Sequence, residues 1–176
     1  MRLIYETHST STDNEAGAAS GHNDPDLSPT GRLQAAELGN RRAADGIDVV
    51  YCLDLLRARR TAEIAFGDTG VPIRTDARLR ECNFGEMNGH PVAEVHAASR
   101  DHVSNPFPDG ESYTDVTRRV GAFLDDLRRE NEARVVLVVA HRAPHHAIEH
   151  ILNGHDLAEL VTGAWEWQPG WEYELA

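Results

Sequence analysis

Two apolar runs, one near each end of the chain, both stop at a histidine. The first covers residues 2–7 and precedes His8, and the second covers residues 134–140 and precedes His141. The second run has no alternating polar residues, which is typical of a central parallel strand buried on both faces. Ligands of parallel α/β sheets bind in the crevice at the carboxyl ends of the strands. We therefore expect His8 and His141 to meet at one crevice.

The segments between these runs alternate in predicted type. Ser28-Pro29 marks a helix start, and the helix is expected to reach about Ala44 with Leu33, Ala36 and Leu38 facing the core. Further strands are expected at 48–52, within 71–81 and at 171–175. Further helices are expected at about 55–65, near 92–99, from Ser112 and from Pro144. The apolar face of the helix from Ser112 is expected to consist of Val116, Val120, Phe123, Leu124 and Leu127. This alternation predicts a three-layer α/β/α sandwich around a mostly parallel sheet.

Length and composition restrict the class of protein. A chain of 176 residues with 40% apolar residues is expected to form one domain over 1–176, with a short cap or insert at 82–111. No apolar stretch approaches the about 20 residues of a membrane span. A net charge of −12 argues against nucleic acid and anionic membranes as partners. The first run leaves no room for a signal peptide, and two cysteines, Cys52 and Cys82, suit the reducing cytoplasm.

All 17 basic residues are arginines, whose planar fork suits bidentate phosphate binding. Arg57 follows the second predicted strand near the start of a helix, where it is well placed to hold an oxyanion. The pairs Arg118-Arg119 and Arg128-Arg129 fit solvated helix faces instead. Glu81 ends an extended segment and is a candidate general acid if burial raises its pKa.

Five ordered segments resemble motifs of the histidine phosphatase superfamily, the phosphoglycerate-mutase-like group, over nearly the whole chain. An asparagine, Asn14, also stands six positions after His8, as in the Arg-His-Gly motif of that family. The segments are Ser20-Gly21 through Gly31, Asp54 through Glu63, Arg80 through Gly85 with Gly89, Phe107 through Ser112, and Val138 through His141.

The resemblance implies a metal-independent phosphatase without a cofactor that acts on a phosphorylated small molecule. His8 would attack phosphorus and form a phosphohistidine, Glu81 would protonate the leaving oxygen, and Arg57 and His141 would hold the phosphoryl oxygens. Mutases of this group are generally longer, so hydrolysis is the expected reaction. Further phosphate or substrate contacts are expected from Thr7, Ser9, Thr10, Asn14, Gly21 and Arg142.

The chain departs from the family pattern next to each histidine. Thr7-His8-Ser9 stands in place of Arg-His-Gly, so one phosphate-gripping arginine is absent, and Arg142 follows His141 where a glycine is usual. A charge-assisted hydrogen bond contributes about 1.5–3 kcal/mol, so an uncompensated loss would slow turnover by about ten- to more than a hundred-fold. Either Arg142 or Arg60 is a candidate to replace the missing charge.

Three other interpretations remain open at this stage. Without the second arginine that would hold the phosphate, the fold could serve as a pseudo-phosphatase that binds a phosphate ligand or a protein. The helical spacing of His141, His145, His146 and His150 could hold a metal ion. The aromatic cluster at the carboxyl end could form a pocket wall or a homodimer surface, although packing of the last strand on the sheet is the favoured explanation; its members are Trp165, Trp167, Trp171 and Tyr173.

Overall fold

One five-stranded sheet organises the computed structural model, which describes residues 1–130 and 133–175. The strand order is β3-β2-β4-β1-β5, so the uninterrupted apolar strand β4 lies in the centre, as predicted. The parallel strands are β1 (Arg2–Thr7), β2 (Val49–Cys52), β3 (Ile73–Thr75) and β4 (Val135–Ala140), and β5 (Trp171–Glu174) runs antiparallel to β1 at the edge. Residues 131–132 and 176 of the expected single domain lie outside the described residues.

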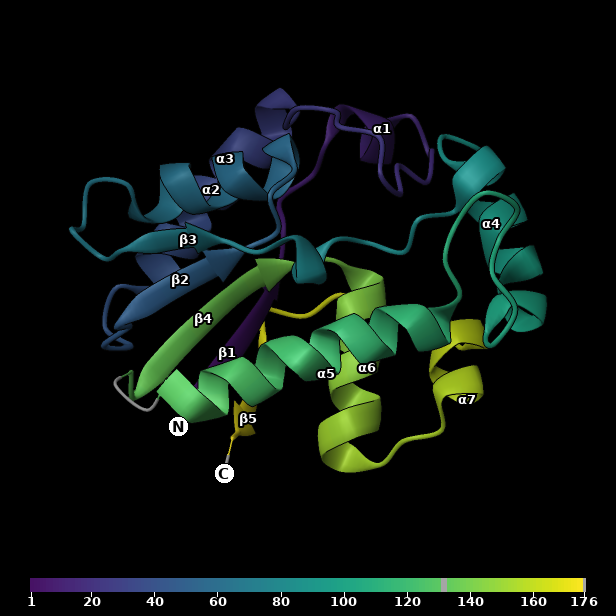
Figure 1. The fold of residues 1–176 in the computed structure, drawn as a ribbon. Helices are drawn as coiled ribbons and strands as arrows, with labels where there is room; N and C mark the ends of the chain where they lie inside the picture. The colour runs from purple at the N-terminus through teal and green to yellow at the C-terminus, as the bar shows by residue number, and fades with distance from the viewer. Residues whose placement is uncertain (131–132, 176) are drawn as a thin grey trace.

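Helices cover both faces of the sheet (Figure 1). On one face lie α2 (Pro29–Arg42) and α3 (Leu56–Phe66), and on the other lie α5 (Tyr113–Glu130) and α6 (Arg142–Asn153). The predicted α/β class with a mostly parallel sheet is therefore confirmed. The remaining elements are α1 (Thr12–Glu15), α4 (Val92–Ala98), α7 (Leu157–Thr162) and the short helices at Ala77–Leu79, Gly85–Met87 and Ser99–His102.

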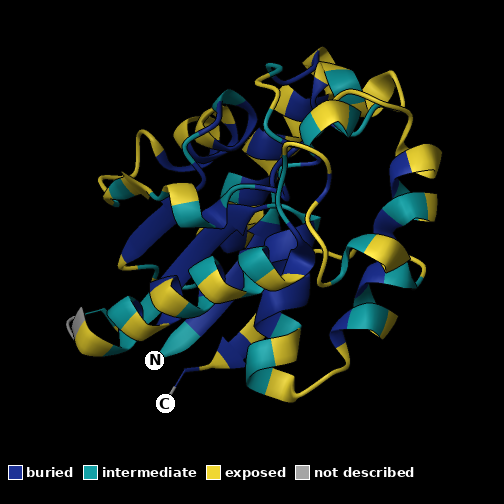
Figure 2. Ribbon diagram, turned by 45° about the vertical axis from the view of Figure 1, so that its right-hand side comes forward, coloured by how far each residue is buried: buried dark blue, intermediate teal, exposed yellow. Residues whose placement is uncertain are grey.

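The core follows the apolar patterns of the sequence. The apolar residues expected on α5 are all buried, and so is the sheet that they cover (Figure 2). Burial of this much apolar surface, at about 25 cal/mol per Å², is the main source of stability for such a fold. Cys52, at the end of β2, is also fully buried, and this burial raises the pKa of its thiol to about 12. It is therefore an inert core residue.

The predicted core face of α2 is wrong in part. Leu33 is 69% exposed and Ala36 is exposed, whereas Ala35 and Leu38 are buried. The cause is the close approach of α2 to its neighbours, since a Cβ on Gly31 would lie 1.9 Å from the carbonyl oxygen of Thr10. The inward face of the helix therefore follows Gly31, Ala35, Leu38 and Arg42, and Leu33 falls on the opposite side. Among the described residues, no helix has the length and apolar character of a membrane span.

Candidate active site

The two strand-end histidines meet because β1 and β4 are neighbours in the sheet. Thr7 pairs with Ala140 at the last position of the parallel register, and the His8 backbone N–H donates to the Ala140 carbonyl at 2.9 Å. The imidazole rings of His8 and His141 consequently lie 4.6 Å apart between centroids, tilted by 37°. The strand ends thus place both rings at the crevice that the sequence predicted.

His8 is held as a neutral imidazole with a defined tautomer. Its Nδ1 lies 2.7 Å from the Ser9 carbonyl oxygen, which can only accept, so Nδ1 carries the hydrogen and Nε2 carries the lone pair. Burial and then the positive charge of Arg57 lower the pKa of His8 to about 3. The side chain can therefore act as a nucleophile through Nε2 at neutral pH.

Arg57 is fully buried in the first turn of α3 and reaches His8 directly. Its Nε donates to His8 Nε2 at 3.2 Å, and its two terminal nitrogens donate to the carbonyls of Asn23 and Gly21, both at 2.9 Å. Burial lowers the pKa of Arg57 to about 10, which still leaves the group charged at neutral pH. The carbonyls fix the orientation of the guanidinium, whose Nε faces His8 Nε2.

Gly21 accepts a hydrogen bond from Arg57 through its backbone carbonyl. It adopts a positive φ of 52°, and a Cβ at this position would lie 1.9 Å from Asn88 Oδ1. The close approach therefore requires glycine. In the structure Gly21 reaches the site through its hydrogen bond with Arg57, whereas the sequence analysis expected a contact with the substrate itself.

Glu81 is buried beside His141. Its Oε1 accepts hydrogen bonds from the backbone N–H groups of Cys82 at 2.7 Å and Ala143 at 3.1 Å, and its Oε2 contacts His141 Nδ1. Burial, together with the nearby charges of His8, Arg57 and Arg142, lowers the pKa of His141. The carboxyl group of Glu81 and the imidazole of His141 thus lie together at the crevice.

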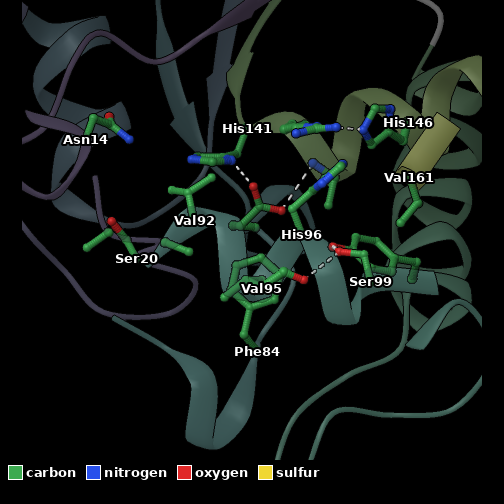
Figure 3. A pocket seen from close by; sticks show the side chains of 16 residues that line it. Asn14, Ser20, Phe84, Val92, Val95, His96, Ser99, His141, His146 and Val161 are labelled. Carbon is green, nitrogen blue, oxygen red and sulfur yellow. Dashed lines mark hydrogen bonds and ion pairs between the residues drawn. The ribbon is translucent and has the colours of Figure 1, made fainter. Parts of the chain in front are cut away.

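Glu81 and His141 line a cavity of about 100 Å³, which Figure 3 shows with His141 labelled. One wall is apolar and includes Phe84, Val92 and Val95, which come from the predicted cap segment. The polar lining residues are Asn14, Ser20, Glu81, His96, Ser99, Tyr113, His141, Arg142 and His146. The cavity suits a small ligand with an apolar stem and polar ends.

The predicted phosphate contacts next to His8 line an adjoining hollow. Thr7, Ser9 and Thr10 lie there with His8, and Asn14 borders both spaces. Asn14 also caps the amino end of α1, because its Oδ1 accepts from the backbone N–H of Ser11, the N-cap residue, at 2.9 Å. The structure thus brings this group to the crevice through the loop that follows β1.

The two arginines considered as substitutes for the missing clamp differ in position. Arg60 is exposed and forms a 3.0 Å ion pair with Glu63, so its charge is directed away from the crevice. Arg142 lines the cavity beside His141, and its hydrogen bonds go to His146 and Gly163.

The hypothesis of a helical metal site is wrong. His145 Nε2 interacts with the Tyr173 hydroxyl at 3.1 Å, His146 Nε2 accepts from Arg142 at 3.0 Å, and His150 Nδ1 faces the His155 carbonyl at 2.8 Å. Each imidazole thus has its own neighbour, and no group of three or more potential metal ligands occurs in the described parts of the chain.

The aromatic residues at the carboxyl end do not form one cluster. Trp165 and Trp171 pack against each other and against His145, with ring centroids 5.4, 5.3 and 4.2 Å apart. Trp167 is 61% exposed and borders the hollow beside His8. Trp171 lies on β5, the last strand, which pairs with β1 at the edge of the sheet.

Sequence reasoning missed Arg119, which is not part of a solvated helix face. It forms an ion pair with Glu111 at 2.9 Å and donates to the carbonyls of Arg78, Arg80 and Glu81 at 2.6, 2.8 and 2.9 Å. It therefore ties the segment that carries Glu81 to helix α5. Its neighbour Arg118 is exposed, as predicted.

Thr61 was also missed, although it lies within a quoted motif. Its hydroxyl donates to the Arg57 carbonyl at 2.8 Å and accepts from the Ser9 N–H at 3.0 Å. It therefore joins α3 to the loop after His8. The position one helical turn after Arg57 was the only available signal, and that signal does not identify a partner.

Comparisons with known proteins agree with this geometry. The family model described as "Histidine phosphatase superfamily (branch 1)" matches residues 7–166. A putative phosphoserine phosphatase of Hydrogenobacter thermophilus is 33% identical, covering 90% of this chain and 82% of the relative. A 2,3-bisphosphoglycerate-dependent phosphoglycerate mutase of Methylobacterium is 30% identical, covering 94% and 86%.

A solved structure shares the whole architecture. YhfR of Bacillus stearothermophilus superposes with a TM-score of 0.85 at 25% identity, covering 98% of this chain and 90% of that one. The shared fold and the family match over most of the sequence lead to one conclusion. The chain belongs to branch 1 of the histidine phosphatase superfamily.

Proposed function

We propose that this protein hydrolyses small-molecule phosphomonoesters through a phosphohistidine on His8. The observation that carries the proposal is the convergence at one crevice of a neutral imidazole, a buried carboxyl group and a guanidinium that pairs with no carboxylate of the described residues. These groups supply a nucleophile, an anion clamp and a proton donor. Phosphatases are among the relatives that share the family.

In the first half-reaction, His8 Nε2 attacks phosphorus as the bond to the leaving oxygen breaks. Arg57 Nε, which donates to Nε2, transfers its hydrogen bond to a phosphoryl oxygen when phosphorus reaches Nε2. Arg57 and His141 then hold the equatorial oxygens, with hydroxyl and amide contacts from Thr7, Ser9, Thr10 and Asn14. Glu81 supplies the proton that the leaving alkoxide needs.

In the second half-reaction, a water molecule attacks the phosphohistidine and restores His8. The Glu81 carboxylate, having lost its proton, accepts one from this water, so each turnover returns every group to its starting state. Arginine and imidazole donors carry the charge stabilisation in this scheme, so we propose a metal-independent reaction. We also propose hydrolysis rather than phosphoryl transfer between substrates, although relatives with mutase names exist.

The segment 82–111 is proposed to act as the cap that selects the leaving group, since Phe84, Val92 and Val95 from it line the cavity. The partner is therefore a phosphorylated small molecule, in a chain whose net charge of −12 disfavours nucleic acids and anionic membranes. We place the protein in the cytoplasm, and we leave a homodimer as a further proposal to be tested by the molar mass in solution.

The test is a phosphoester panel that includes p-nitrophenyl phosphate and 3-phosphoglycerate, applied to the wild type and His8→Ala. We expect phosphate release by the wild type, an acid-labile protein phosphate after rapid quenching, and loss of both in the variant. Ligand binding without turnover by the wild type would contradict the proposal and favour the pseudo-phosphatase. Formation of 2-phosphoglycerate from 3-phosphoglycerate would contradict the hydrolase assignment.

A further inference from the structure

The ion pairs of the arginines single out two residues. Every buried or half-buried arginine that the structure describes pairs with a carboxylate, apart from Arg57 and Arg142. A guanidinium withdrawn from water without a counter-ion is costly, so its presence calls for an explanation. For Arg57 the explanation is the phosphoryl group at His8. Arg142 needs a second anion.

The Arg142 guanidinium is fixed by hydrogen bonds, but one of its nitrogens makes none with the described residues. Its Nε donates to His146 Nε2 at 3.0 Å, one Nη2 hydrogen goes to the Gly163 carbonyl at 2.9 Å, and its guanidinium carbon lies 5.5 Å from the Trp165 ring centroid. Nη1 makes no hydrogen bond with any residue that the structure describes. The side chain lines the cavity beside Glu81 and His141. A fixed fork with a free donor is suited to a carboxylate or phosphate oxygen.

His146 positions Arg142 without adding charge. Burial and the charge of Arg142 lower the pKa of His146 to about 3, so its ring stays neutral at physiological pH and can accept through Nε2. His146 (labelled in Figure 3) lies on the same helix as Arg142, one turn later. The pair therefore presents a single positive charge in a fixed direction.

The position of Arg142 assigns it to the leaving group. Its hydrogen bonds go to His146 and Gly163, whereas those of Arg57 include His8. The cavity that Arg142 lines also contains Glu81, the proposed donor to the leaving oxygen, and the apolar wall formed by Val92 and Val95. A leaving alcohol in this cavity would have its oxygen at Glu81 and its carbon chain along that wall.

We infer that Arg142 binds a second anionic group on the alcohol portion of the substrate, a carboxylate or a phosphate separated from the scissile phosphate by a short carbon chain. This inference rests on the proposed phosphatase function and deepens it. Arg142 would thus determine specificity for doubly anionic phosphomonoesters, while Arg57 and His141 hold the group that is transferred. His146 acts as its positioning residue.

The test uses three esters that share a primary phosphate on a three-carbon chain: propyl phosphate, 3-phosphooxypropanoate and propane-1,3-diyl bisphosphate. The wild type is expected to favour at least one anionic ester over propyl phosphate in kcat/KM, and the better of the two identifies the second anion. Arg142→Gln is expected to reduce that preference by about ten- to a hundred-fold, the usual effect of losing a charge-assisted hydrogen bond. The exposed Arg60→Gln is the matched control and leaves the preference unchanged.

Variants of His146 separate positioning from folding. His146→Leu removes the acceptor for Arg142 Nε and is expected to lower the preference, whereas His146→Gln keeps an acceptor and restores part of it. Arg142→Lys keeps the charge but loses the fork, and it should give an intermediate preference. An equal loss on all three esters in Arg142→Gln and Arg142→Lys would overturn the inference, because Arg142 would then grip the transferred phosphate or only support the fold. An unchanged preference would also overturn it.

A binding measurement keeps the inference testable without turnover. Calorimetric titration of 3-phosphooxypropanoate and propyl phosphate into His8→Ala and His8→Ala/Arg142→Gln gives the same comparison of affinities. Selective binding that depends on Arg142, in a protein whose wild type hydrolyses none of the esters, would support the inference and refute the phosphatase. Turnover of propyl phosphate without any preference for the charged esters would support the phosphatase and refute the inference about Arg142.

Discussion

Thr7 is the side chain that most clearly separates this crevice from the Arg-His-Gly pattern. It borders the hollow beside His8, where a longer cationic side chain could meet the phosphoryl group. We expect Thr7→Arg to raise kcat/KM for propyl phosphate about tenfold or more, the equivalent of one charge-assisted hydrogen bond. Thr7→Gln, which has no charge, is the control and should not give this increase. An unchanged or lower rate for Thr7→Arg would mean that the site is already adapted to a single clamp.

The position of Glu81 beside His141 leads to a second prediction about individual residues. Glu81→Gln removes the acid, and general acid catalysis contributes about 10²–10⁴-fold. We expect kcat on propyl phosphate to fall by this amount and kcat on p-nitrophenyl phosphate to fall much less, because nitrophenolate leaves without protonation. Rapid-quench kinetics on both substrates provide the measurement. Equal losses would assign Glu81 to ground-state binding or to the fold.

Residue types and strand ends were sufficient to predict His8, Arg57, Glu81 and His141 as a group that the fold brings together. For the two histidines the reason is that parallel strands end at one edge of the sheet, whatever the path of the chain between them. Glu81 does not end a strand, because β3 stops at Thr75 and a short helix at Ala77–Leu79 follows, so its expected place at the end of an extended segment was wrong. The direction of Arg142 could not be predicted. It depends on the acceptor on His146 and on the carbonyl of Gly163, which α7 brings to the cavity.

Helix α5 links the sheet to the loop that carries Glu81. Arg119 makes this link through Glu111 and three backbone carbonyls, and its loss would leave these groups without partners. We expect Arg119→Gln to lower the free energy of unfolding by about 2 kcal/mol. We also expect it to reduce kcat more on propyl phosphate than on p-nitrophenyl phosphate, because Glu81 is displaced.

The adjacent exposed residue offers the control for this element. Arg118 forms only an i,i+3 ion pair with Asp115 on the helix surface, and such pairs contribute little. Denaturation curves and rates for Arg118→Gln should match the wild type. If Arg119→Gln were destabilised with equal rate losses on both substrates, its role would be limited to the fold. The two neighbours have the same sequence signal, so only the path of the loop distinguishes them.

Helix and strand positions followed from periodicity more reliably than helix faces did. Val116, Val120 and Phe123 were assigned correctly because α5 has one broad apolar stripe. Leu33 was assigned incorrectly because the close approach of Gly31 to the Thr10 carbonyl fixes which side of α2 faces inward, and Leu33 lies on the other side. Such packing depends on backbone distances that no single-sequence pattern contains.

At the scale of the whole molecule, several histidines are folded into the interior in neutral form. Burial lowers the pKa values of His8, His145 and His146 to about 3, 4 and 3, from an ordinary value of 6.5. Below pH 6.5 the unfolded chain therefore takes up protons that the folded protein does not hold. Stability is fully present above pH 6.5 and is lost as the pH falls toward the folded-state values.

The size of this effect predicts acid unfolding at a mild pH. Each buried histidine contributes about 1.4 kcal/mol per pH unit, so the group lowers the free energy of unfolding by about 4 kcal/mol per unit below pH 6. Since domains have only about 5–15 kcal/mol in total, we expect unfolding between about pH 5 and pH 4. Urea denaturation from pH 7.5 to 4.5 measures the slope. His145→Gln should flatten it by about 1.4 kcal/mol per unit, whereas exposed His150→Gln should not, and a slope near zero in the wild type would mean that these imidazoles are protonated in the folded state.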